Sequence, residues 1–135
     1  MFDTKIAIVI RDDLAVWQKL NVTAFLTSGI VGATPDIIGD TYVDAADNIY
    51  NPLIIQPMMI MAASAEKMPT IYRRAMDRGT RLSLYIEEMF ATGNDDANRQ
   101  AVRAAQPDSM IIVGLAMRDE RKVIDKITKG LKLHG

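Results

Sequence analysis

The sequence predicts an α/β protein with a mainly parallel sheet. Short apolar, β-branched runs alternate along the chain with segments of helical periodicity, the pattern of strands joined by crossover helices. The chain has 135 residues, the size of one ordinary domain. No repeat, linker or low-complexity stretch interrupts the alternation. We therefore expect residues 1–135 to fold as a single domain.

Four segments have the character of sheet strands. Three are nearly continuous apolar runs, typical of buried strands covered on both faces: Lys5–Ile10, Met58–Ala62 and Met110–Leu115. Pro57 lacks an N–H group, which suits the position that enters the second run. Leu82–Ile86 alternates between apolar and polar residues and is the fourth predicted strand.

A small hairpin is predicted between the first helix and the second of these strands. Thr34-Pro35 and Gly39 break the chain there, and Tyr42–Val43 is a brief extended piece. The residues that follow favour a tight turn: Asp44, Asp47 and Asn48.

The first helix follows the first strand directly. We expect Asp13 to cap it, and the apolar stripe to continue up to Ser28-Gly29. Residues at three- and four-residue spacing are predicted to form its inner face: Trp17, Leu20 and Ala24. Val22, Phe25 and Leu26 widen this stripe, so the helix is apolar on more than one side.

Three further helices have recognisable start or stop signals. Pro69 fits the first turn of the second helix, and Gly79 fits its end. Thr92 or Asn94 is expected to cap the third helix, and Asp119 the last one. The second helix should turn three side chains inward: Tyr72, Ala75 and Met76.

Composition excludes several classes of function. The chain has no cysteine, which excludes disulfides, thiolate metal sites and thiol catalysis and is typical of a cytoplasmic protein. Its one histidine, His134, rules out a multi-histidine metal site and argues against a Ser-His-Asp triad. No phosphate loop or dinucleotide fingerprint is present. We therefore expect no metal and no cofactor.

Charge and hydropathy give little sign of nucleic acid or membrane as a partner. Basic and acidic residues balance at 16 against 17. The longest apolar run, Leu53–Ala63, is far shorter than the ~20 residues of a spanning helix. A stripe on the last helix, formed by Lys122, Lys126 and Lys129, predicts a solvated face, with contact to an RNA backbone as the alternative.

Several segments resemble known families. Lys5–Leu14 and Met110–Leu133 are similar to the first strand and the last strand-helix-strand of peptidyl-tRNA hydrolase II. Three others more closely resemble the domain-of-unknown-function 2000 family: Leu20–Leu26, Tyr42–Ala45 and Phe90–Arg99. The resemblance implies a three-layer α/β/α domain with a mixed sheet of about four strands, like that of peptidyl-tRNA hydrolase II.

The catalytic elements of the hydrolase are only partly matched. Its Arg-x-Asp-Leu sequence is matched by Arg11, Asp13 and Leu14. Its Gly-Lys pair is not, because Lys19 falls one residue early and one residue turns a helix by 100°. Thr92-Gly93-Asn94-Asp95 stands in place of its Asp-Ala-Gly-x-Thr segment. We therefore expect no peptidyl-tRNA hydrolase activity.

One group of candidate site residues lies where the first strand meets the first helix. Arg11, Asp12 and Asp13 occupy the end of a strand, a common place for ligands in α/β proteins. The alternative is that Asp13 only caps the helix and Arg11 is its ion-pair partner.

A second group gives the first helix a polar side. Lys19, Asn21 and Thr23 belong to it, and a partly desolvated lysine can serve as a base near neutral pH. The alternative is a solvated helix face without a site.

The third group is the polar loop Thr92–Asn98. We expect it to form a rim of the principal pocket with Arg11 and the start of the first helix. Its hydroxyl and amide groups exceed what one helix cap requires, which leaves Asn94 and Asn98 available for a ligand. An elaborate cap is the alternative.

Two functions are consistent with these groups. The first is binding of a small molecule or protein partner, with these ligand-binding residues: Arg11, Asp12, Asn21, Thr23, Asn94 and Asn98. The second is a hydrolase or transferase acting on an ester or amide such as peptidyl-tRNA, with Lys19, Asp13 and Thr92 as catalytic residues. Lys19 and Thr92 within roughly 8 Å in one concave pocket favour catalysis, and positions on different sides favour binding. Either function is compatible with a homo-oligomer.

Overall fold

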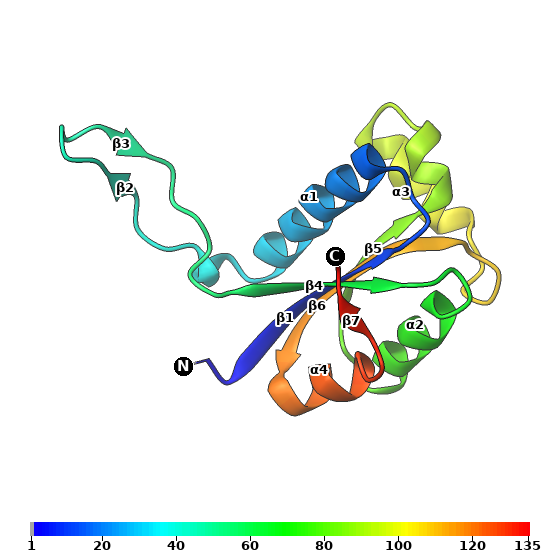
Figure 1. Ribbon diagram of the computed structural model, residues 1–135. Coiled ribbons are helices and arrows are strands. Elements are labelled where there is room, and N and C mark those ends of the chain that lie inside the picture. The colour runs from blue at the N-terminus through cyan, green and yellow to red at the C-terminus, as the bar shows by residue number, and fades with distance from the viewer. Residues whose placement is uncertain (1) are drawn as a thin grey trace.

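A five-stranded sheet forms the centre of the computed structural model, which describes residues 2–135 (Figure 1). The strands are ordered β5 (Leu82–Ile86), β6 (Ile112–Glu120), β1 (Thr4–Arg11), β4 (Met58–Ala63) and β7 (Lys132–Leu133). Only β1 and β4 pair in parallel, while the other three pairs are antiparallel. The sheet is mixed, but the prediction that it is mainly parallel is wrong, and it has five strands rather than four.

The direction of β6 explains why the sheet is not mainly parallel. The last residue of β5, Ile86, pairs with the first residue of β6, Ile112, so the intervening chain leaves and re-enters the sheet at the same end. This connection contains the 3-10 helix η2 (Glu87–Ala91) and helix α3 (Asp95–Ala104). Because α3 does not cross a face of the sheet, β6 runs antiparallel to both of its neighbours.

Two apolar cores lie on opposite faces of the sheet. Helix α1 (Val16–Ala33) covers one face, and helices α2 (Met68–Asp77) and α4 (Arg121–Ile127) cover the other. The first core contains Ile6, Ile8 and Ile10 of β1 with Val22, Leu26 and Ile30 of α1. The second contains Ala7 and Val9 of β1 with Ile71 of α2 and Ile124 of α4. The domain therefore has three layers.

A hairpin projects away from these layers. It consists of β2 (Tyr42–Val43) and β3 (Ile49–Tyr50) and follows the 3-10 helix η1 (Pro35–Ile37). Figure 1 shows it in cyan and teal, extending beyond the end of α1. Its base is fixed by the N–H of Ile55, which donates to the Ile37 carbonyl at 2.8 Å. The predicted hairpin is confirmed.

The expected inner face of α1 is wrong. Val22, Leu26 and Ile30 are its buried residues, whereas the predicted inward set is exposed: Trp17, Leu20 and Ala24. Positions two residues apart differ by about 200° around a helix, so the two stripes lie on opposite sides. The prediction that α1 is apolar on more than one side is confirmed. Because two sides of the helix are apolar, the spacing of its apolar residues does not show which side is buried.

The predicted caps also differ in two places. Helix α1 begins at Val16, and the Ala15 N–H donates to the Gln18 side chain at 3.0 Å, so Asp13 lies too early to cap it. Strand β6 extends through Asp119, whose carboxylate accepts from the Thr80 hydroxyl at 2.8 Å. Asp119 is therefore a strand residue and not the cap of α4.

Burial was overestimated at two methionines. Met76 is 53% exposed because α2 turns Met68, Ile71 and Ala75 inward. Met58 is 37% exposed at the start of β4. The neighbouring strand β7 is two residues long and pairs only with Met61 and Ala62, so the first residues of β4 lie at an open edge.

Candidate functional site

An open groove runs between α1 and α3, with β5 and η2 beneath it. Its larger hollow has a volume of about 830 Å³, and a smaller hollow beside it about 320 Å³. Both are within the range of small-molecule sites. The two hollows share five lining residues and thus form one continuous site: Phe25, Tyr85, Met89, Asp95 and Asn98.

A glycine allows α1 to approach β5 at this groove. A Cβ atom at Gly29 would lie 2.9 Å from the Ser83 Cβ and still closer to its hydroxyl. Both residues line the larger hollow. The close approach brings the side of α1 that carries Phe25 beside Tyr85 of β5.

Aromatic rings form the apolar wall of the groove. Trp17 meets Phe90 edge-on at a centroid distance of 6.0 Å, and Phe90 lies 5.1 Å from Tyr85. Tyr85 in turn lies 6.1 Å from Phe25. Four of the eight aromatic residues of the chain thus gather in one site, which offers ring faces and edges to a flat ligand.

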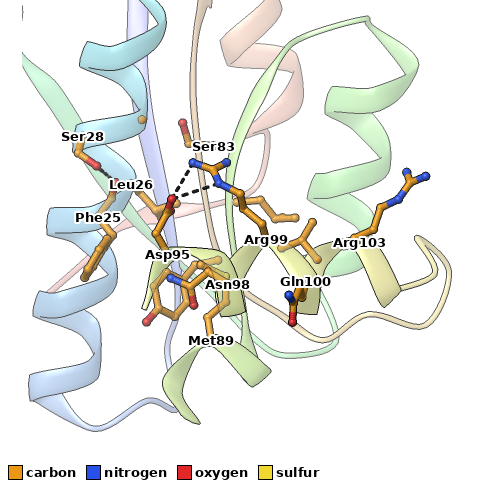
Figure 2. A pocket seen from close by; sticks show the side chains of 14 residues that line it. Phe25, Leu26, Ser28, Ser83, Met89, Asp95, Asn98, Arg99, Gln100 and Arg103 are labelled. Atoms are coloured by element: carbon orange, nitrogen blue, oxygen red, sulfur yellow. Dashed lines mark hydrogen bonds and ion pairs between the residues drawn. The ribbon is translucent and has the colours of Figure 1, made fainter. Parts of the chain in front are cut away.

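Helix α3 supplies the charged side of the groove. Figure 2 shows Asp95, Asn98 and Arg99 facing Phe25 and Ser28 of α1, with Arg103 pointing away from the centre. Arg99 Nη2 lies 2.9 Å from Asp95 Oδ2, an ion pair between two exposed side chains one helical turn apart. The lining of the larger hollow contains two arginines and one aspartate, a net charge of +1.

The Tyr85 hydroxyl is an available polar group. Tyr85 is 5% exposed, and burial raises the pKa of its phenol. Within residues 2–135 the structure gives this hydroxyl no hydrogen bond. The hydroxyl oxygen is not a buried atom, because it reaches solvent in the groove, and it is therefore accessible to a ligand there.

Asn98 offers a second polar group. The Thr92 hydroxyl contacts both the Met89 carbonyl, at 3.0 Å, and the Asn98 amide oxygen. A hydroxyl has one proton and can donate to only one of them. Rotation of the Asn98 amide, which exchanges its nitrogen and oxygen, satisfies both contacts and directs the oxygen elsewhere.

Part of the predicted polar loop lines the groove. Thr92 and Asn94 line the smaller hollow, Asn98 lines both, and the start of α1 contributes Trp17 and Asn21. Asn94 is also the cap of α3, because its Oδ1 accepts from the Ala97 N–H at 2.8 Å.

The residues at the end of β1 lie outside both hollows. Arg11 is paired with Asp13 at 2.6 Å and lies 3.7 Å from Glu87. The Asp12 backbone N–H donates to the Ala63 carbonyl at 2.9 Å. Arg11 is therefore held away from the rim where the sequence had placed it.

Lys19 and Thr23 also lie outside the groove. Each is two residues from Asn21, about 200° around α1, while Asn21 lines the smaller hollow. The Thr23 hydroxyl donates to the Lys19 carbonyl at 2.7 Å. Lys19 therefore points away from the side of α1 that faces Thr92.

Sequence reasoning missed the aromatic wall and Arg99. Trp17, Asn21, Phe25 and Ser28 are spaced at four, four and three residues, a stripe that would have identified the groove side of α1. The stripe does not identify a site by itself, because Trp17 and Phe25 at helical spacing are also typical of a core-facing side. The rings of Tyr85 and Phe90 come from a distant segment, and no local pattern links them to α1.

Neither a metal centre nor a membrane span is found in the part of the chain that the structure describes. Across residues 2–135, acidic and histidine side chains do not gather in groups of three or more that could hold a metal ion. No helix within the same range combines the length and apolar character needed to cross a bilayer.

The fold and the groove define a mixed, three-layer α/β domain with a ligand-sized site at one side of the sheet. Residues 4–135 match the family described as "Protein of unknown function (DUF2000)", and the chain belongs to this family. The predicted resemblance to that family is confirmed. A search of curated proteins finds no match.

A solved structure is similar over the full length. It is a protein of unknown function from Agrobacterium tumefaciens strain C58, 60% identical in sequence, with a TM-score of 0.98. The match covers 100% of each chain.

Proposed function

We propose that this protein binds a small, planar aromatic molecule with an acidic group in the groove between α1 and α3. The observation that carries the proposal is the run of four rings, Trp17, Phe90, Tyr85 and Phe25, along hollows of suitable volume. Flat apolar molecules gain from contact with such rings, and a few polar groups fix their orientation.

Several groups would supply that orientation. The Tyr85 hydroxyl and the Asn98 amide lie beside the rings, and the Asn21 amide borders the smaller hollow. The Asn94 oxygen is used in capping, so its contribution would come from the amide nitrogen. Arg99 faces the centre of the groove, and its guanidinium would pair with an acidic group of the ligand.

We favour binding over hydrolysis or group transfer. The three residues expected to be catalytic are dispersed: Thr92 in the groove, Lys19 on another side of α1, and Asp13 beside Arg11. A base and a hydroxyl in separate places cannot act on one bond. The groove contains polar groups that can bind a ligand, but it lacks a catalytic base beside the Thr92 hydroxyl.

We also propose a common fold ancestry with peptidyl-tRNA hydrolase II. It is supported by the strand-helix-strand tail, β6, α4 and β7, which has the order expected from the resemblance. The Arg11-x-Asp13-Leu14 sequence at the end of β1 is the second supporting feature.

Two dyes that differ in one charged group test the function. Anilinonaphthalene sulfonate is an aromatic anion, and N-phenyl-1-naphthylamine is its neutral counterpart. Fluorescence titration should show tighter binding of the anion. Tyr85→Phe and Asn98→Ala should each weaken it, by roughly 1 to 3 kcal/mol for a lost buried hydrogen bond.

A matched variant separates the groove from the rest of α1. Leu20→Ser removes an exposed apolar side chain two residues from buried Val22, outside the groove, and should leave the affinity for the anion unchanged. Equal affinity for both dyes, or loss of binding in Leu20→Ser but not in the groove variants, would contradict the proposal.

A further inference from the structure

The outer side of α1, formed by Val16 and Leu20, and the projecting hairpin are two apolar surfaces that are exposed within residues 2–135. A helix that is apolar all round is normally buried on all sides. Val16 and Leu20 are nevertheless 71% and 67% exposed. Lys19 is the only charged residue in α1.

The hairpin is apolar on both of its faces. Tyr42 pairs with Tyr50 and Val43 with Ile49, so one pair lies on each face, and all four side chains are more than half exposed. Leu53 and Ile55 continue the apolar surface toward the base. An isolated two-stranded hairpin is marginal in water and requires packing against another element.

The geometry points to a second copy of this chain as the partner, with the hairpin of each copy lying along the outer side of α1 of the other. Such reciprocal contacts form a closed two-fold dimer. Nine residues from Ile38 to the turn at Ala46 reach about 30 Å at the rise of a strand. Helix α1, with 18 residues, is about 27 Å long, so the lengths match.

The available area is sufficient for a stable dimer. A large side chain that is half exposed presents about 100 Å². Six such side chains give about 600 Å² per copy, or about 1,200 Å² in all, the lower end of the range for specific interfaces. They are Val16 and Leu20 of α1, the one hairpin pair that faces the helix, Val43 and Ile49, and Leu53 and Ile55.

Charge selects α1 over a second hairpin as the contact. Residues 34–57 contain four aspartates and no basic residue: Asp36, Asp40, Asp44 and Asp47. Two hairpins would therefore repel each other. The outer side of α1 has no acidic residue, and Lys19 adjoins it, which favours an acidic hairpin there.

Molar mass in solution is the first test. Light scattering after gel filtration should give twice the 15.0 kDa of one chain. Val43→Ser with Ile49→Ser, outside both cores, should give a folded monomer by circular dichroism, and Lys19→Glu should raise the dimer dissociation constant at least tenfold. Met76→Ser, which changes an exposed residue of α2, is the control, and this variant should remain dimeric. A wild-type monomer at millimolar concentration would overturn the inference.

Cysteine crosslinking tests the arrangement, since the chain has no cysteine of its own. Leu20→Cys and Ile49→Cys variants, mixed and mildly oxidised, should form the mixed disulfide in excess over either homodimer. Met76→Cys with Ile49→Cys is the matched control. A dimer in which only the Leu20→Cys or only the Ile49→Cys homodisulfide forms would overturn the hairpin-on-helix contact.

Discussion

Two asparagines four residues apart have different structural roles. The oxygen of Asn94 closes the first turn of α3 through the Ala97 N–H, whereas Asn98 faces the groove and contacts Thr92. Both lie in the segment Thr92–Asn98, which the sequence predicts as a polar loop, but Asn98 belongs to α3. Their roles can be separated because one acts on a backbone group and the other on a side chain beside the site.

Replacing Asn94 should mainly affect stability. Asn94→Ala removes the cap and should lower the free energy of unfolding by about 1 kcal/mol. Asn94→Asp, which also caps, should restore it, and Asn98→Ala should change it much less. Urea unfolding followed by circular dichroism measures these differences. An unchanged midpoint for Asn94→Ala would contradict the assigned cap.

At the tip of the hairpin, Asp44 is held as a carboxylate. The hydroxyl of Tyr50 donates to it at 2.7 Å, and the Asn48 side chain and the Asn48 and Ala46 N–H groups add further bonds. Together they lower its pKa from 3.8 to about 2, and the Tyr50 bond is the largest cause. The bond raises the pKa of Tyr50 in turn.

The stability of the hairpin turn should therefore depend on pH. Because the pKa is lower in the folded turn, the stabilisation is present above pH 3.8 and is lost as the pH falls through about 2. A carbon-detected NMR titration should show Asp44 ionising near 2, and Tyr50→Phe should move the value toward 3.8. The same value in both proteins would exclude the Tyr50 bond as the main cause.

Among the elements, α1 is positioned against the sheet by two glycines, Gly114 of β6 and Gly29 of α1 itself. A Cβ at Gly114 of β6 would lie 2.6 Å from Val22 and 2.9 Å from Leu26, both buried on α1. Gly29 permits the close contact with β5 at the groove. These two positions set the spacing of helix and sheet on which the site depends.

Enlarging Gly114 should therefore destabilise the protein. Gly114→Ala should lower the free energy of unfolding by about 1 to 3 kcal/mol, since a stiff valine and the helix must shift. Gly32→Ala is the control, because a Cβ there meets nothing within 4 Å. It should not lower stability. Equal unfolding midpoints for Gly114→Ala and the wild type would contradict the described packing.

Some elements were predictable because their pattern is local. The apolar runs of β1 and the alternation of β5 placed both strands, and Gly79, with a φ of 69°, ends the turn after α2 as expected. Strand direction was not predictable in this way. Whether the chain between β5 and β6 crosses the sheet depends on where α3 packs, which is a tertiary property.

The candidate site also has one part that follows a local sequence pattern and one part that depends on tertiary structure. Its polar loop is one contiguous segment, so its composition alone indicated Thr92, Asn94 and Asn98. The aromatic wall is assembled from α1, β5 and η2, and only the folded chain brings those rings together. The predicted grouping of Lys19, Asn21 and Thr23 on one side of α1 is wrong, because two residues turn a helix by about 200° and Asn21 therefore faces away from the other two.

At the scale of the whole molecule, the charge and the dispersed residues predict no action on peptidyl-tRNA. The net charge is −1, which gives little attraction to a polyanion. The purified protein should release no detectable peptide from an N-acetylated aminoacyl-tRNA, and Lys19→Ala should not alter that result. Efficient cleavage that depends on Lys19 would contradict the assignment of the groove to binding alone.

The binding of an aromatic acid in the groove is tested most directly by mapping it residue by residue. In a ¹H–¹⁵N NMR titration with 1-naphthoate, the largest shift changes should occur at the indole N–H of Trp17, the only tryptophan, and at the backbone of Tyr85, Asn98 and Arg99. Tyr85→Phe should weaken the saturation curve without changing the set of shifted signals. Shifts confined to the hairpin or to Leu20 and Val16, or no shifts at millimolar naphthoate, would contradict the account.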